Sequence, residues 1–455
     1  MRALSVAISP DGRHLAAGLR GRALLRWTLR GEAATAEAPL TDFTSWVNAV
    51  AFAADGSALI AGSSDQNARV FDPSSGVELR QLPGPSIVTG VGVAGGRPVT
   101  ASTDGALRVW RAMSPLWRKG GDPVYNLATD AEGRRWLAGG TATEGISLWR
   151  LGATPQRVSV PTASLPDGDA QVGAVGVAPN GAFLLGGTRQ GKVISWPLTD
   201  AGVGKPSLAD THAGSIGYVA VSPDSTLVAA MEYGGTRTVL FRAGGAGRLA
   251  YLATMETRVP QLLGFSPDGT LLAVALAAKK VQLWSVADPA APSLAGEITD
   301  VDSAPISVAY AASKPLLAVG SDSGHVTVWD TSDPSSPQRL HDLGDAHSSA
   351  YGVLFSPDAG TLVATTGDGL VWGWDLTRSQ PRTRFALNGE LGRTWDVRFL
   401  DRGKTMAVAG DNGGVRVWAA DATAARDLLC RTRGDALSEL EWARYLPGIA
   451  PRDPC

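Results

Sequence analysis

The sequence has little cysteine and no long apolar run. Only two of its 455 residues are cysteine, Cys430 and Cys455, so neither a disulfide framework nor a cysteine-rich zinc site can hold the body of the chain. Its best apolar run, residues 271–278, has eight residues, against the roughly 20 that a membrane-spanning helix needs. The N-terminus has no basic region followed by an apolar stretch, which excludes a secretory signal. We therefore expect a cytoplasmic location.

The chain also lacks an excess of charge of either sign. It has 41 basic and 43 acidic residues and a net charge of −2, so no global field favours nucleic acid or an anionic membrane. We expect no nucleic-acid partner. Hydrophobic residues make up 44% of the chain, which is enough for a large core. The 55 glycines and 28 prolines suit many tight turns.

One pattern occurs ten times along the chain. It consists of a short alternating strand, a Pro-Asp-Gly-like turn, a second strand, a tight turn, and a third strand that ends in an aromatic residue. Successive closing aromatics are 39 to 47 residues apart. They are Trp27, Phe71, Trp110, Trp149, Trp196, Phe241, Trp284, Trp329, Trp374 and Trp418.

The first strand of every copy carries an aliphatic residue at one position. These residues are Val6, Val50, Val91, Leu127, Val175, Val219, Leu263, Val308, Val353 and Val397. Two residues further on, nine of the ten copies are apolar, and the residue between is mostly alanine or glycine. Large side chains on one face and small ones on the other suit a sheet that neighbouring sheets cover on both faces. The pattern predicts an all-β propeller of four-stranded blades.

The repeat resembles the WD-repeat β-propeller family, whose blades of about 40 to 45 residues end in Trp-Asp. The dipeptide Trp374-Asp375 closes the ninth copy in this way, and the resemblance covers about residues 3–420. It implies a hydrogen-bond cluster of His347, Asp368 and Trp374 in that copy. The sixth copy has a histidine at the corresponding position but lacks the matching aspartate and tryptophan.

Ten copies exceed the four to eight blades of a typical propeller. Counting back from the end favours a seven-bladed propeller over residues 122–420, preceded by three WD-like blades over residues 1–121. A single ten-bladed ring is the alternative. Three blades alone leave two blade faces exposed to water and should be marginally stable. Because the chain begins inside a first strand, we expect an incomplete gene product or a domain excerpt.

Residues 421–455 break the pattern and predict a tail with short helices over 424–432 and 436–446. The tail resembles one that follows WD repeats in actinobacterial proteins, including STAND-type signalling NTPases. That resemblance implies a contact between Cys430 and Cys455, with the disulfide and the reduced pair both left open.

Motifs for chemistry are absent or fail on inspection. Residues 90–95 match the letters of a dinucleotide fingerprint, but no helix follows them. None of the residues that open the ten first strands is acidic, and one step on only Asp396 is charged. A single carboxylate cannot hold a divalent ion. We therefore predict no catalytic residue, no cofactor and no metal site.

Aromatic residues open three of the strands that should line the channel. Tyr125, Tyr351 and Trp395 share one phase there and are candidates for binding a protein partner; the alternative is that they cap the core. The sequence predicts a non-enzymatic interaction scaffold, or the sensor domain of a larger bacterial signalling protein. A propeller hydrolase or lactonase and a purely structural repeat array are the alternatives.

Overall fold

The computed structural model describes residues 2–31, 33–41, 43–54, 56, 58–73, 76, 78–83, 86–94, 97–110, 122–141, 145–152, 155–161, 172–211, 214–344, 346, 348–388, 393–411 and 413–420. They divide into two compact units, the first within residues 1–120 and the second within residues 121–424. The two predicted tail helices, Cys430 and Cys455 lie outside the described residues.

The described part of the chain is all-β, as predicted. It folds into antiparallel sheets, most of them four-stranded, whose strands pair mainly in the order of the sequence. The helical elements found there are two 3₁₀ turns, η1 (Gly245–Gly247) and η2 (Asp401–Gly403). No helix in the described ranges is long and apolar enough to cross a membrane.

The first unit contains three sheets. Their strands are β1 (Ala3–Ile8), β2 (His14–Leu19), β3 (Leu24–Arg30) and β4 (Ala33–Ala36); β5 (Val47–Phe52), β6 (Leu59–Ser63), β7 (Asn67–Phe71) and β8 (Glu78–Pro83); and β9 (Val88–Ala94), β10 (Arg97–Ser102) and β11 (Leu107–Val109). The look-alike dinucleotide motif at residues 90–95 begins within β9 and is followed by β10, so the prediction that no helix follows it is confirmed.

The second unit contains the remaining sheets. The sheet of the fourth repeat consists of β12 (Val124–Thr129), β13 (Trp136–Thr141), β14 (Ile146–Arg150) and β15 (Gln156–Val158), and that of the fifth of β16 (Val172–Val177), β17 (Phe183–Thr188), β18 (Lys192–Thr199), β19 (Gly202–Val203) and β20 (Ser207–Asp210). The sixth and seventh repeats form β21 (Ile216–Val221), β22 (Leu227–Glu232), β23 (Arg237–Ala243) and β24 (Leu249–Glu256), and β25 (Pro260–Phe265), β26 (Leu271–Leu276), β27 (Lys280–Ser285) and β28 (Ser293–Ile298). The last three repeats form β29 (Pro305–Tyr310), β30 (Leu316–Ser321), β31 (Val326–Asp330) and β32 (Gln338–Asp342), then β33 (Ala350–Phe355), β34 (Thr361–Thr366), β35 (Leu370–Asp375) and β36 (Arg382–Asn388), and finally β37 (Thr394–Leu400), β38 (Thr405–Gly410) and β39 (Val415–Ala419).

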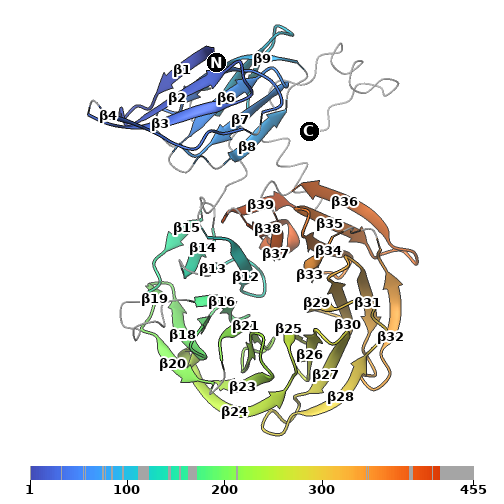
Figure 1. Cartoon of the computed structure of the whole chain (residues 1–455). Coiled ribbons are helices and arrows are strands. Elements are labelled where there is room, and N and C mark those ends of the chain that lie inside the picture. The colour runs from blue at the N-terminus through green and yellow to red at the C-terminus, as the bar shows by residue number, and fades with distance from the viewer. Residues whose placement is uncertain are drawn as a thin grey trace. The chain divides into compact units, whose positions relative to one another are not determined.

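The first strands of these sheets lie side by side around the middle of the second unit (Figure 1). Each contacts the next, from β12 through β16, β21, β25, β29 and β33 to β37, and β37 contacts β12. The outer strands, such as β24 and β28, lie on the periphery of the unit (Figure 1).

The cores of both units lie between neighbouring sheets. In the second unit, for example, Trp196 and Val175 of one sheet pack against Trp136 and Leu148 of the sheet before it. The side chains of Trp196 and Leu148 are fully buried. This arrangement confirms the prediction that large side chains on one sheet face are sandwiched by the next sheet, and it explains the repeated aliphatic and aromatic positions.

Hydrogen bonds from the first strands also join adjacent sheets. Asn126 Nδ2 donates to the carbonyl oxygen of Val175 over 3.1 Å, and Ser307 Oγ donates to the carbonyl oxygen of Ala350 over 2.7 Å. Both donors belong to the residue just before the aliphatic position that recurs in every repeat. Polar side chains at this position thus satisfy buried backbone groups of the neighbouring sheet.

The turns follow the predicted chemistry. Gly105, Gly324, Gly369 and Gly413 have φ values of 81°, 92°, 84° and 71°. Such values are unfavourable for residues with a side chain, which accounts for glycine at these tight turns between second and third strands.

The Pro-Asp turn between first and second strands is held by a small hydrogen-bond network. In the ninth repeat, Ser356 Oγ donates to Asp358 Oδ1 over 2.5 Å, and the Gly360 amide donates to the same oxygen over 3.0 Å. The Thr361 amide in turn donates to Ser356 Oγ over 2.9 Å. The hydrogen bonds from Ser356 and from the Gly360 amide lower the pKa of Asp358 below its usual value of 3.8.

Replacing Asp358 by alanine is expected to lower the free energy of unfolding at pH 7 by about 1 kcal/mol, because two donors lose their acceptor. The contribution is present while the carboxylate is ionised and is lost as the pH falls through the lowered pKa of the folded state. The difference between wild type and variant, measured by urea unfolding from pH 7 down to pH 3, should therefore shrink toward the acid end. Asp322→Ala, at an exposed position, is the control and should change little.

Candidate partner-binding site

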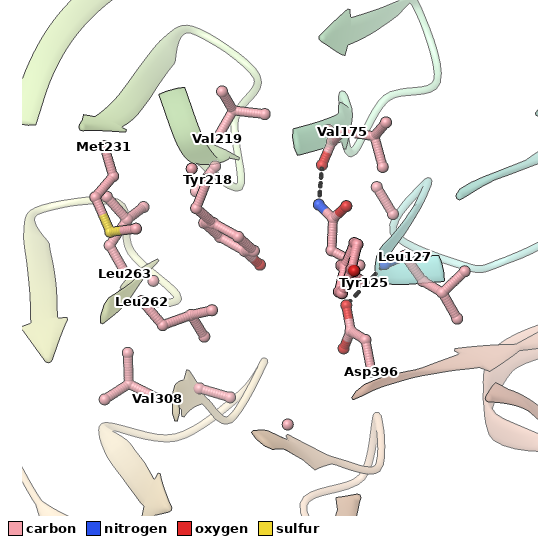
Figure 2. Close-up of a pocket in the computed structure, with 18 of the residues that line it drawn as sticks. Tyr125, Leu127, Val175, Tyr218, Val219, Met231, Leu262, Leu263, Val308 and Asp396 are labelled. Carbon is pink, nitrogen blue, oxygen red and sulfur yellow. Dashed lines mark hydrogen bonds between the residues drawn. The ribbon is translucent and has the colours of Figure 1, made fainter. Parts of the chain in front are cut away.

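The second unit contains an open cavity of about 860 Å³ along its innermost strands. Its walls are largely apolar, with Val219, Met231, Leu262 and Val308 among the lining residues (Figure 2). The residues that open the first strands, such as Tyr125, Gly217 and Tyr351, line this cavity, and we call the end where they lie its mouth. A concave apolar wall with few polar groups is typical of a binding site.

The structure brings the three predicted aromatic residues together at this mouth. The ring centroids of Tyr351 and Trp395 are 4.4 Å apart, and those of Tyr125 and Trp395 are 5.3 Å apart. Trp395 Nε1 donates to Asp411 Oδ1 over 2.6 Å, which fixes the orientation of the indole. Tyr125 is 42% exposed, and Tyr351 and Trp395 are half-buried, so this aromatic cluster presents part of its surface to solvent.

Asp396, the charged residue singled out from the sequence, lies next to the cluster and is 8% exposed. Its Oδ2 accepts a hydrogen bond from the Leu127 amide over 2.8 Å, which joins β37 to β12 (Figure 2). Its Oδ1 lies 2.6 Å from Arg398 Nη1, which also donates to the carbonyl oxygen of Val397. Arg398 Nη2 lies 3.3 Å from the hydroxyl of Tyr218 on β21.

Burial has the largest influence on the pKa values of Asp396 and Tyr218. Desolvation raises the pKa of Asp396 above its usual value, and Arg398 and the Leu127 amide oppose that rise. Burial likewise raises the pKa of the Tyr218 hydroxyl. Asp396 connects the last and first sheets of the unit, because its Oδ2 accepts from the Leu127 amide of β12 while its Oδ1 pairs with Arg398 of its own strand.

Sequence reasoning missed Arg398 and Tyr218. A signal for Arg398 was present, because most other repeats have alanine or glycine at its position, as at Ala128 and Gly264. An arginine among small residues on a strand that lines the cavity indicates a special role for its side chain.

Three basic residues of the second unit are exposed, and one of them, Arg189, lines the cavity. Arg189, Arg258 and Lys279 come from loops that follow β17, β24 and β26, and all three are exposed. Within the described ranges none of them forms an ion pair. Tyr233, which is 75% exposed, and Val259, which is 41% exposed, lie among these loops. Val259 has a φ of 50°, a strained conformation for a β-branched residue.

One group of side chains could offer ligand atoms to a cation, and none of its members lines the cavity. Carboxylate oxygens of Asp302 and Asp342 and a ring nitrogen of His325 lie within 4.8 Å of one another. However, His325 Nδ1 is 3.4 Å from Asp342 Oδ1, and Arg339 Nη1 is 3.6 Å from Asp342 Oδ2. Arg339 therefore competes with a cation for this carboxylate. No sequence motif marks this group, because its members come from three separate segments.

The cluster implied for the ninth repeat is only partly described. His347 lies outside the described residues. Asp368 accepts hydrogen bonds from Thr366 Oγ1 and from the Leu370 amide within its own turn. Trp374 is 1% exposed, and among the described residues its Nε1 has no hydrogen-bond partner.

Comparison with known proteins supports the assignment of the repeat. The family model "WD domain, G-beta repeat" matches residues 37–72, which include β5, β6 and β7 and end at Phe71-Asp72. The chain thus contains a WD40 repeat. WD40 repeats generally serve protein interaction and are generally non-enzymatic.

Two mammalian proteins are also similar to part of the chain. Telomerase protein component 1 of Rattus norvegicus is 25% identical over a region that covers 43% of this chain. Telomerase protein component 1 of Mus musculus gives the same identity and the same share. The matched region spans 9% of the length of each of these relatives.

Proposed function

We propose that this protein is a non-enzymatic scaffold or sensor that binds a protein partner at the mouth of the cavity in its second unit. In this proposal residues 122–420 form a closed seven-bladed WD propeller, and residues 1–121 contribute three blades of another. The contact of β37 with β12 and the hydrogen bond between Asp396 and Leu127 support closure of the ring.

The observation that carries the proposal is the composition of the mouth. Its aromatic cluster of Tyr125, Tyr351 and Trp395 is partly exposed, and aromatic side chains contribute strongly to binding energy at protein interfaces. The carboxylate beside them, Asp396, is already paired with Arg398. The mouth therefore offers contact surface but no evident set of reactive groups.

The similarity to telomerase protein component 1 is consistent with an interaction role, since that protein is by its name one component of telomerase. Membership of a larger bacterial signalling protein and a cytoplasmic location remain part of the proposal on the basis of the sequence alone.

Affinity capture from the host lysate tests this function. The double variant Tyr351→Ala/Trp395→Ala should reduce recovery of specific partners at least tenfold, because it removes most of the aromatic contact surface. Tyr251→Ala provides the matched control, since Tyr251 is a 56% exposed tyrosine on the peripheral strand β24. Thermal unfolding of both variants verifies that they are folded. Unchanged recovery with a folded double variant would contradict the proposal.

Within the described residues, the group of Asp302, His325 and Asp342 favours the alternative of a metal-dependent hydrolase. Elemental analysis of the purified protein, together with assays on small esters and lactones, tests this alternative. A protein with no bound transition metal and no turnover, even after addition of Zn²⁺, would remove it.

A further inference from the structure

The first sheet of the first unit exposes apolar residues at positions that are buried elsewhere in the chain. Val6 and Ile8 on β1 are 59% and 58% exposed. At the repeat position of Val6, Val50 is 8% exposed, Val175 is 1% exposed and Val397 is fully buried. The difference arises because each of those residues packs against a preceding sheet, as Val50 does against Leu24 and Ala16.

The third sheet of the first unit exposes apolar residues on the face of its closing strand. Leu107 and Val109 on β11 are 75% and 53% exposed. Their counterparts in the seventh repeat, Val281 and Leu283, are fully buried. In that repeat the closing strand packs against the next sheet, where Val308 and Leu317 lie.

One of the two exposed faces is a first-strand face and the other is a closing-strand face. Where neighbouring sheets meet in the described cores of both units, a closing-strand face of one sheet covers a first-strand face of the next. The β1 face therefore fits a sheet that presents a surface like that of β11. Removing such faces from water is favourable in proportion to the apolar area covered.

We propose that the first units of two copies of this chain associate, with the Val6 face of each copy covering the Val109 face of the other. Three sheets are too few for a closed propeller, whereas two sets of three give six, which lies within the usual range of four to eight. Each copy supplies both faces, so the same contact forms twice and the assembly closes with twofold symmetry. This association goes beyond partner binding at the second unit.

Sedimentation equilibrium of the full chain tests the proposal. The wild type should form a dimer of twice 47.1 kDa at micromolar concentration. Val6→Lys alone and Val109→Glu alone should each raise the dimer dissociation constant at least tenfold, because each change places a charge in both interfaces. Both positions are exposed in the separate unit, so the variants should fold. Leu340→Lys is the matched control, because Leu340 is 45% exposed on the outer strand β32, and it should leave the dimer intact.

A mixture of the two variants tests whether the Val6 face of one copy covers the Val109 face of the other. In a mixed dimer one interface is unchanged, and the other pairs the introduced lysine with the introduced glutamate in place of the two valines. Mixing Val6→Lys with Val109→Glu should therefore restore the dimer. A wild type that is monomeric at 100 µM protein, a dimer that neither variant weakens, or failure of the mixture to recover would each overturn the proposal. If sheets of another protein cover these faces instead, the wild type should be monomeric on its own.

Discussion

Replacing Asp396 by alanine is expected to lower the free energy of unfolding of the second unit by about 3–5 kcal/mol. Asp396 Oδ2 accepts the Leu127 amide across the junction of β37 and β12, and Oδ1 pairs with Arg398 over 2.6 Å. The substitution leaves the largely buried guanidinium of Arg398 without its counter-charge and a buried amide without an acceptor. Both are costly in a region of low dielectric.

A second ion pair joins the same two sheets and provides the control. Arg402 Nη2 lies 3.0 Å from Glu132 Oε1, and both side chains are more than half exposed. Because water screens exposed ion pairs, Glu132→Gln should produce no measurable change in stability. Urea unfolding followed by tryptophan fluorescence compares the two variants, with the transitions of the two units fitted separately. Equal and small effects would show that the Asp396 junction does not stabilise the contact of β37 with β12.

The strands and turns were predictable from the sequence because their causes are local. Burial on both faces selects an aliphatic residue at a fixed position of every first strand, and Val175, Val219 and Val353 are indeed nearly fully buried. Tight turns select glycine by its backbone conformation, as at Gly369. The resemblance to WD repeats rested on the same positions, and the match at residues 37–72 supports it.

The site was predictable only in part, because its contacts join distant segments. The phase of Tyr125, Tyr351 and Trp395 placed them correctly at one end of the first strands, and the structure brings them into contact. The approach of Arg398 to Tyr218, 180 residues away in the sequence, depends on which sheets face each other across the cavity. A repeat pattern alone does not specify that relation.

Replacing Trp374 by alanine is expected to lower the free energy of unfolding by about 3–5 kcal/mol as well. Its side chain is 1% exposed and packs in the core between the eighth and ninth repeats, together with Val328, Val353 and Phe355. Removal of the indole leaves a large cavity that the β-sheets on both sides can close only partially. Urea unfolding of the variant at pH 7 measures the loss.

Trp27 occupies the same position of the first repeat and offers a matched comparison. It is only half-buried, because no sheet within the first unit precedes its own. Trp27→Ala should therefore cost clearly less than Trp374→Ala when measured on dilute protein. In the proposed dimer a second copy covers the face that Trp27 shares with Val6 and Ile8. The loss of unfolding free energy caused by Trp27→Ala should then grow as the protein concentration is raised. The reason is that dimer formation stabilises the wild type by mass action and stabilises the variant less. Equal losses for the two tryptophans at every concentration would contradict the difference in burial from which both expectations derive.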